Sequence, residues 1–491
     1  MYDDMDQHPA VERKSGETAD LGSLTQLLSR LSENPEQFLD KRAADFPAMA
    51  GVRAAANRLI ESIKGAVRHR RGQGVAQTPA SNDTSTTPAA HQSPEWSTPV
   101  IPLRCYVCRT LVAQPHPDYP RMCQRCGDEN LARRTRSADL TGRRALVTGA
   151  RVRIGYQIAL KLLRAGATVE GVTRFPALAA ARYAEEPDFE TWSHRLTLHG
   201  VDLRQLSAVQ HLATELQRPG PLDLLVNNAA QTIRLPRAHY VLLVDREQQR
   251  LQELSETARA CLAPHDPHRH MTALTSQSAA LFEGLPALIG AEVATSARLT
   301  QVPLLEHDLA SALSSPVAWD AEGEPLDLRE ENSWSQTLEQ VHGMELLEVH
   351  AVNALAPFLL IQALLPAFRS SPSPRRFIIN VSAKEGRFYE ANAARHPHTN
   401  MAKAALNMLT KTIAPELRRE GIYVNSVDPG WVSDQRPFPI AEQDRDLLGD
   451  WLPLDAVDGA ARILAPVWDG ILDSTEPESG VLWRNYQVVP W

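Results

Sequence analysis

The chain has 491 residues, and at about 150 residues per domain this length predicts roughly three folding units. Hydrophobic residues make up 43% of the chain and charged residues 22%, which excludes collagen-like and fully disordered proteins because this composition can bury a core. The net charge of −8 gives no general attraction to phosphate backbones, so nucleic acid is not the expected partner.

The sequence carries no clear membrane or secretion signal. No stretch approaches the roughly 18 uninterrupted apolar residues of a membrane-spanning helix, and the acidic start MYDDMDQ differs from the basic start of a signal peptide. A cytoplasmic protein without membrane contact is therefore expected.

The first segment, residues 1–71, predicts a helical module. Its apolar residues recur at the three- to four-residue spacing of one helix face, from Leu39 to Val67. Residues 72–99 contain no Leu, Ile or Phe and are rich in Ser, Thr, Pro and Ala, which predicts a flexible linker. The module is expected to dock on the same chain or to form homo-oligomers. A protein partner bound through the apolar helix face is the alternative.

Residues 100–136 contain four of the five cysteines, in two Cys-x-x-Cys pairs: Cys105, Cys108, Cys123 and Cys126. Two such pairs can place four thiolates around a zinc ion, and a site with four protein ligands is structural rather than catalytic. The sequence therefore predicts a zinc ribbon, which could also bind a protein partner. The basic run that follows is expected to be a solvated connection between two domains, and contact with an acidic surface is the alternative: Arg133, Arg134 and Arg136.

From residue 139 onward, apolar strands alternate with helical patterns, which predicts a Rossmann-like, doubly wound parallel α/β sheet. The expected strands are 144–148, 169–174, 198–203, 224–230, 377–382 and 422–430. The first strand leads into a glycine turn, from Gly149 to Gly155, and then into an amphipathic helix with Ile158 and Leu162. This order places a helix N-terminus beneath a pyrophosphate group. Residues 333–336 are expected to form a capping box that begins the helix holding Asn353.

Together with the sequence Asn227-Asn-Ala-Ala230, these features resemble the short-chain dehydrogenase/reductase family from residue 139 to near the C-terminus. The resemblance implies a nicotinamide coenzyme and oxidoreductase activity. It assigns the following residues to the coenzyme: Gly149, Ile154 and Gly155 in the glycine turn, Asp202 and Leu203 at the adenine, Asn228 in the nucleotide cleft, Lys403 at the ribose, and Pro429 and Gly430 beside the nicotinamide.

Charge around the second strand favours NADP(H) over NAD(H). Arg174 follows this strand, where an acidic residue would bind a ribose 2′-hydroxyl and an arginine would bind a 2′-phosphate. Arg151 and Arg153 add positive charge in the glycine turn. The alternative is that these arginines only pair with surface carboxylates. Arg153 also stands where the family has its middle glycine, so a wider turn and weaker coenzyme binding are expected.

The family's catalytic pattern is incomplete in this sequence. The resemblance assigns catalytic roles to Asn353, Ser382 and Lys403, but Thr399 occupies the position of the proton-donating tyrosine, four residues before the lysine. A threonine hydroxyl reaches less far than a phenol and is a much weaker acid. Three outcomes remain: Tyr389 or His398 acts as the acid, Thr399 relays a proton through water, or the fold binds NADP(H) without turnover.

A long insertion, about residues 233–327, separates the fourth strand from the helix of Asn353. It contains a helical stretch over 247–262 and is expected to form a lid or a partner-docking surface at the edge of the sheet where ligands bind. The histidines of residues 264–270 are expected to be solvated rather than metal ligands. The leading hypothesis is an NADP(H)-dependent oxidoreductase of an unknown carbonyl or alcohol substrate. The alternative is a catalytically silent NADP(H)-binding sensor or scaffold.

Overall fold

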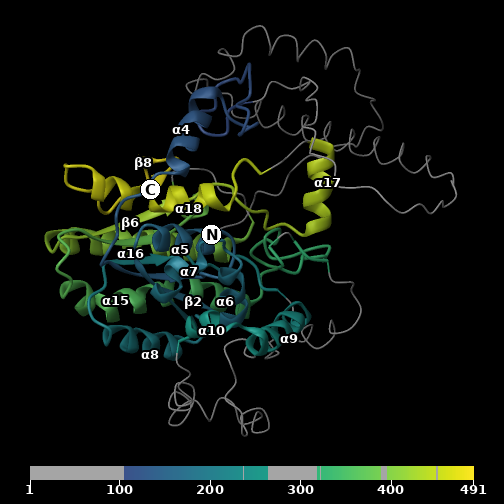
Figure 1. Cartoon of the computed structure of the whole chain (residues 1–491). Helices are drawn as coiled ribbons and strands as arrows, with labels where there is room; N and C mark the ends of the chain where they lie inside the picture. Colours follow the sequence, from purple (N-terminus) through teal and green to yellow (C-terminus); the bar gives the residue numbers. More distant parts are fainter. Residues whose placement is uncertain (1–103, 236, 264–317, 321, 389–394, 449–451) are drawn as a thin grey trace, which may run out of the picture. The chain divides into compact units, whose positions relative to one another are not determined.

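The computed structural model describes residues 104–491, apart from residues 236, 264–317, 321, 389–394 and 449–451 (Figure 1). The chain divides into two units, Met1–Glu95 and Trp96–Trp491, and all of the described residues belong to the second. The N-terminal helical module, most of the insertion with its three histidines, and Tyr389 lie outside the described residues.

The second unit is built on one sheet in the order β3-β2-β1-β4-β5-β6-β7-β8, parallel except for the last pair. Its strands are β1 (Arg144–Thr148), β2 (Thr168–Thr173), β3 (Leu196–Gly200), β4 (Leu224–Asn227), β5 (Arg376–Val381), β6 (Ile422–Asp428), β7 (Leu482–Arg484) and β8 (Gln487–Val489). The doubly wound α/β fold is therefore confirmed. Each of the six expected strands begins within two residues of its expected position, because buried apolar runs mark central parallel strands.

Helices cover both faces of this sheet (Figure 1). One layer contains α5 (Arg153–Arg164), α6 (Pro176–Ala184) and α18 (Ala456–Leu472). The other contains α8 (Leu206–Gln217), α15 (Ala356–Arg369) and α16 (Pro397–Arg419). The connections between these elements contain further helical segments: α7 (Phe189–Trp192), η1 (Ser193–Arg195), α14 (Gly343–His350), η3 (Ala351–Leu355), η4 (Lys384–Gly386) and α17 (Phe438–Leu448).

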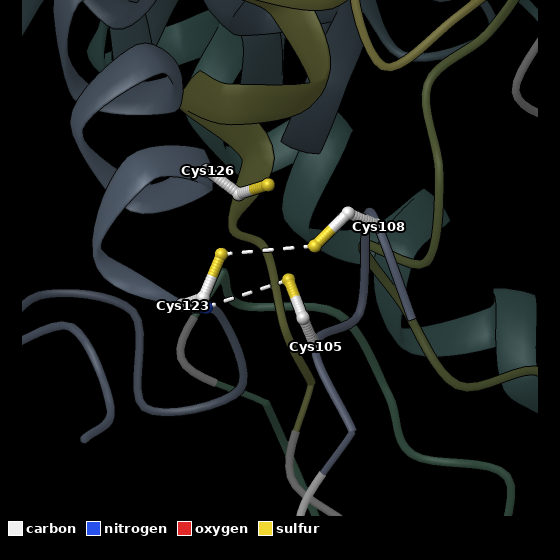
Figure 2. Close-up of side chains that lie close together, drawn as sticks. All are labelled: Cys105, Cys108, Cys123 and Cys126. Carbon is white, nitrogen blue, oxygen red and sulfur yellow. Dashed lines mark hydrogen bonds between the residues drawn. The ribbon is translucent and has the colours of Figure 1, made fainter. Parts of the chain in front are cut away.

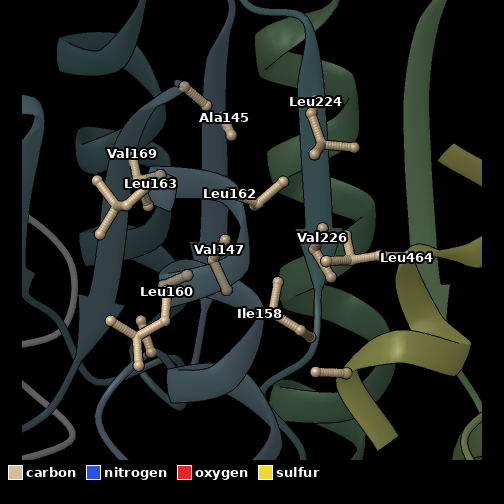
Figure 3. Close-up of a cluster of buried hydrophobic side chains, with 14 of the residues drawn as sticks. Ala145, Val147, Ile158, Leu160, Leu162, Leu163, Val169, Leu224, Val226 and Leu464 are labelled. Atoms are coloured by element: carbon tan, nitrogen blue, oxygen red, sulfur yellow. The ribbon is translucent and has the colours of Figure 1, made fainter. Parts of the chain in front are cut away.

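Helix α5 illustrates how the sequence pattern builds the core. Ile158, Leu162 and Leu163 are fully buried and face β1, β2 and β4, where Val147 and Val226 pack beside them (Figure 3). Truncating a buried leucine to alanine at such a position costs about 2–5 kcal/mol of stability. This packing holds the N-terminus of α5 at the end of β1, where the candidate site lies.

The segment Gly343–Arg369, formed by α14, η3 and α15, is the one described helix that is long and apolar enough to cross a membrane. More than half of its apolar window (56%) is buried inside the fold, and α15 packs on the sheet, so its hydropathy matches that of a core helix. The expected capping box at 333–336 is wrong. The helix begins ten residues later, where His342 caps it by accepting the backbone N–H of Met344.

The described part of the insertion contains α9 (Arg237–Glu253) and α10 (Glu256–Ala260), followed after a gap by a turn at residues 318–327. The expected helical stretch 247–262 therefore consists of the end of α9 and the whole of α10. Residues 261–263 extend the edge of the sheet at β3, because the Leu198 N–H donates to the carbonyl of Cys261 and the Leu198 carbonyl accepts the N–H of Ala263.

Candidate active site and metal centre

A cleft opens at the carboxyl ends of the parallel strands, where the chain leaves β1 and β4 in opposite directions. Such switch points leave a crevice because the two connections diverge. All of the predicted coenzyme residues line this cleft, and so do Ser382 and Thr399. The structure therefore brings the glycine turn and the remaining catalytic positions, more than 200 residues apart in sequence, to one place.

The glycine turn is held against the loop that follows β4. Asn228 donates its side-chain amide to the carbonyl of Thr148 at 3.0 Å, and the Thr148 hydroxyl accepts the backbone N–H groups of Asn228 and Ala229. A Cβ atom on Gly155 would lie 2.1 Å from the carbonyl oxygen of Gly149, so only glycine fits there. The packing of the turn itself thus requires Gly155.

The N-terminus of α5 suits a pyrophosphate group. Val152, the residue before the helix, makes no side-chain cap, and the first turn contains no acidic residue. Its free backbone N–H groups and the helix dipole favour an anion. Arg153 adopts a φ of +53°, a left-handed conformation that costs a residue other than glycine about 1–2 kcal/mol.

Two of the predicted phosphate-binding arginines are paired within the chain. The two terminal guanidinium nitrogens of Arg151 donate to the Glu324 carboxylate, at 2.5 and 2.7 Å, and a terminal nitrogen of Arg153 lies 2.8 Å from a carboxylate oxygen of Asp320. A third arginine, Arg182 of α6, pairs with Glu322. These carboxylates lie close together in the insertion and are called here the acidic turn: Asp320, Glu322 and Glu324. The alternative in which the arginines pair with carboxylates therefore describes Arg151 and Arg153 in this structure.

Arg174 directly follows β2 and lines the cleft. Its guanidinium group is 4.9 Å from the ring of Tyr240 in α9 and 5.7 Å from the ring of Phe175. Aromatic contacts of this kind help to hold an arginine side chain in place. Nearby, burial disfavours the charged form of Asp202, but Arg204 at 2.7 Å holds the pKa of Asp202 below its usual value.

One end of the cleft holds two of the predicted catalytic residues, Ser382 and Lys403, and is called here the catalytic end. The Ser382 hydroxyl is buried and has no hydrogen-bond partner among the described residues. The Lys403 ammonium donates to the carbonyl of Val381 at 2.7 Å. Burial lowers the pKa of Lys403 to about 8, while Glu385 and Asp428 partly oppose this shift.

Asn353 is hydrogen-bonded to the loop after β4, which lines the cleft. It lies in the π-helical segment η3, and its amide both donates to the carbonyl and accepts from the N–H of Gln231, each at 2.8 Å. A π-helical turn inside an α-helix often marks a functional position. Asn353 does not itself line the cleft but fixes the loop after β4 that does.

The candidate proton donors have different positions. The Thr399 hydroxyl donates to the carbonyl of Thr232 at 3.2 Å at the wall of the cleft. His398 is buried, is not among the cleft-lining residues, and has its pKa lowered to about 4 by burial and by two neighbouring histidines. His398 is therefore a neutral, enclosed ring near pH 7. Tyr389 lies outside the described residues, so its role stays a prediction.

The four cysteines of the predicted zinc ribbon lie together, and their sulfur atoms are all within 4.8 Å of one another (Figure 2). The Sγ atoms of Cys108 and Cys123 are 3.7 Å apart, close to the roughly 3.8 Å that tetrahedral zinc with Zn–S bonds of about 2.3 Å requires. Hydrogen bonds with Thr110 lower the pKa of the Cys108 thiol to about 6. The donor set and its spacing therefore fit zinc.

The ribbon is joined to the sheet domain by charged contacts from α4 (Gln124–Arg134). Asp458 at the start of α18 is buried and accepts hydrogen bonds from Tyr119, Asn130 and Arg134, at 2.7–2.9 Å. Arg133 and Arg136 both pair with Asp469 of α18. The expectation of a solvated basic connection is therefore wrong, because α18 supplies carboxylates that the local sequence does not reveal.

Some cleft residues were not singled out from the sequence. Tyr106, between the first two cysteines, and Tyr240 both line the cleft, as do the carboxylates of the acidic turn. The compact motif Asp-x-Glu-Gly-Glu at 320–324 was the one available signal, since three acidic residues around a glycine predict a charged turn.

Two family models match the chain, one on each side of the insertion. A model described as short chain dehydrogenase matches residues 143–242, and one described as enoyl-(acyl carrier protein) reductase matches residues 331–453. They cover the glycine turn and the segment from Asn353 to Gly430, respectively.

Individual proteins are also similar to this chain. An uncharacterized protein of Acanthamoeba polyphaga mimivirus is 31% identical over 381 residues, covering 74% of this chain and 71% of that protein. The L-xylulose reductase of Mesocricetus auratus is 41% identical over 97 residues, covering 20% of this chain and 36% of that enzyme. The crystal structure of a metagenomic short-chain oxidoreductase in complex with NADP is 22% identical, with a TM-score of 0.39 over 69% of this chain and 96% of that chain.

The matching family models, the observed strand order and the glycine turn all agree with the resemblance found in the sequence. The chain belongs to the short-chain dehydrogenase/reductase family.

Proposed function

We propose that this protein is an NADP(H)-dependent oxidoreductase that interconverts a carbonyl compound and an alcohol. The observation that carries the proposal is the buried Ser382 hydroxyl, which has no partner among the described residues and shares the cleft with Lys403. A buried polar group without a partner is costly unless a ligand supplies one. A substrate oxygen would satisfy this hydroxyl. The coenzyme, when bound, supplies hydride transfer at its nicotinamide ring.

The preference for NADP(H) rests on Arg174. Among the three arginines that the sequence assigns to the phosphates, Arg174 is the one that directly follows β2, and the rings of Tyr240 and Phe175 lie beside its guanidinium group. Its position at the end of β2 is where a ribose 2′-phosphate would lie. We therefore assign discrimination between NADP(H) and NAD(H) mainly to Arg174.

The proton donor is proposed to be a water molecule held by Thr399. In carbonyl reduction the substrate oxygen gains a proton as the carbon gains hydride, so a donor must reach that oxygen. Thr399 is at the cleft wall, but its hydroxyl is too short and too weak an acid to replace a phenol directly. The Lys403 ammonium would stabilise the developing negative charge electrostatically. The buried and neutral His398 is a poorer candidate.

The four-cysteine cluster is proposed to hold one structural zinc ion. All four ligand positions are thiolates, so no coordination position is left for substrate. Native mass spectrometry of the full chain should find one zinc per chain, lost in Cys105→Ser. Full thermal stability in a zinc-free preparation would contradict the assignment.

The alternative function is a silent NADP(H)-binding protein, and the observation that favours it is threonine at the tyrosine position. Turnover with a panel of aldehydes, ketones and alcohols separates the two functions. Ser382→Ala should lower turnover on the order of 100-fold while coenzyme affinity stays nearly unchanged. Ser370→Ala, on the exposed end of α15, is the matched control. If wild-type protein binds NADPH tightly but never oxidises it with any of these substrates, the silent function holds.

A further inference from the structure

We propose that Tyr106 of the metal-binding ribbon is a positioning residue for the nicotinamide side of the cleft, so that metal and coenzyme binding are coupled. The inference rests on the proposed function, because it assumes that a coenzyme occupies the cleft. It goes further by giving the ribbon a role in the active site rather than in stability alone.

The first observation is a direct hydrogen bond between the ribbon and the loop after β6. Tyr106 lies between Cys105 and Cys108, and its phenol oxygen accepts the backbone N–H of Trp431 at 2.7 Å. The contact is so close that a Cβ atom on Gly430 would be 2.8 Å from this oxygen, and Gly430 also has a φ of +89°. Both Tyr106 and Gly430 line the cleft.

The second observation is that the ribbon and this loop share one apolar core. Cys105, Met122 and Cys126 are buried in a cluster that includes Leu454, with Val432 packed against it. The guanidinium group of Arg121 lies 5.6 Å from the ring of Trp431, and the Arg121 carbonyl accepts the N–H of Tyr106. The loop from Pro429 to Val432 is therefore packed against the same residues that surround the cysteine cluster.

The third observation is a polar connection on the other side of the loop. Arg462 of α18 donates to Asn130 in the ribbon helix at 3.1 Å, to Asn485 at 2.8 Å and to the carbonyl of Pro429 at 3.4 Å. The loop is thus contacted by the first cysteine pair from one side and by the α4–α18 connection from another.

These contacts imply reciprocal coupling. A metal ion fixes the backbone around Cys105 and Cys108, which sets the position of the Tyr106 phenol and through it the N–H of Trp431. Without the metal the four cysteines have no common ligand, and the Tyr106 contact loosens. If the metal strengthens coenzyme binding by this route, the coenzyme must strengthen metal binding by the same factor in affinity.

The test is Tyr106→Phe, which removes the accepting oxygen and retains the ring. Zinc content should stay at one per chain, while the dissociation constant for NADPH rises about five- to tenfold, as expected for one lost hydrogen bond. Hydrogen exchange of a peptide covering residues 429–433 should become faster. Tyr423→Phe, near the opposite end of β6, is the matched control and should change neither measurement.

Removal of zinc from the wild-type chain with a chelator should produce the same faster exchange at residues 429–433, and added zinc should reverse it. Wild-type exchange and wild-type NADPH affinity in Tyr106→Phe would overturn the inference while leaving the proposed function intact. If the wild-type chain does not bind NADPH, the proposed function is wrong. Unchanged hydrogen exchange at residues 429–433 after zinc removal is a separate result, and it would overturn the inferred link between the metal site and this loop.

Discussion

The two ends of the cleft differ in whether their polar side chains are already paired with carboxylates of the same chain. At the phosphate end, Arg151 and Arg153 are already paired with carboxylates of the acidic turn. At the catalytic end, the Ser382 hydroxyl has no partner among the described residues, and Lys403 is hydrogen-bonded to a neutral carbonyl. The comparison indicates that a coenzyme must compete with internal carboxylates at one end, while the other end is left open to a substrate.

The largest effect is expected from Lys403→Met, which removes the charge at the catalytic end. Turnover should fall on the order of 100-fold or more, as for loss of a group that stabilises a developing charge. Steady-state kinetics measures this, with Lys411→Met on the exposed face of α16 as the control. A variant that retains turnover would show that the catalytic end does not depend on this amine.

Arg174→Ala tests the phosphate end. Loss of a charge-assisted contact should weaken NADPH binding about 10- to 100-fold, while NADH binding changes less than about threefold. Calorimetry with both coenzymes measures the difference, and Arg250→Ala, exposed on α9, is the control. Equal losses for the two coenzymes would end the assignment of the 2′-phosphate to Arg174.

The pH dependence of activity should report Lys403. Its pKa is lowered to about 8, so the ammonium form is present below that pH and is lost as pH rises through it. The ratio kcat/KM, which reports ionisations of the free enzyme, should therefore decline above pH 8 by up to about tenfold per pH unit. A profile that is flat to pH 10 would contradict this.

The same shift has a consequence for stability. Between the folded pKa of about 8 and the ordinary lysine value of about 10.4, the unfolded chain binds more protons at this residue than the folded chain. Burying Lys403 therefore costs stability below pH 8, and this cost decreases as pH rises through that window.

A substitution in the acidic turn is expected to increase NADPH affinity rather than decrease it. Glu324→Gln should free Arg151 for the coenzyme phosphates and tighten NADPH binding about three- to tenfold. Glu331→Gln, an exposed carboxylate outside the turn, is the control for the change in net charge. Weaker binding in Glu324→Gln would mean that the carboxylate positions Arg151 for the coenzyme instead of competing with it.

The smallest effect is expected at Arg153, where the left-handed backbone favours glycine. Arg153→Gly should leave the folded turn unchanged and raise stability by up to about 1 kcal/mol, which thermal unfolding measures. A clear loss of stability would show that the Asp320 ion pair outweighs the backbone strain.

The sequence predicted the sheet well because each central strand is a short buried apolar run between turn signals, as in Arg144–Thr148. It also predicted the cysteine cluster, since the two ligand pairs are local motifs. The contacts that define the two ends of the cleft join distant residues: Arg151 and Glu324 are 173 positions apart, and Tyr106 and Trp431 are 325 apart. No local pattern specifies which carboxylate or backbone N–H such a side chain meets, because tertiary packing decides it.

The central claim is that the cleft beyond β1 and β4 binds NADP(H), and isothermal titration calorimetry of the full chain with NADPH tests it most directly. We expect saturable binding of one NADPH per chain, and we expect Arg174→Ala to weaken the binding of NADPH far more than the binding of NADH. Absence of any binding heat at several temperatures, with well-folded protein and with both NADPH and NADP⁺, would contradict it.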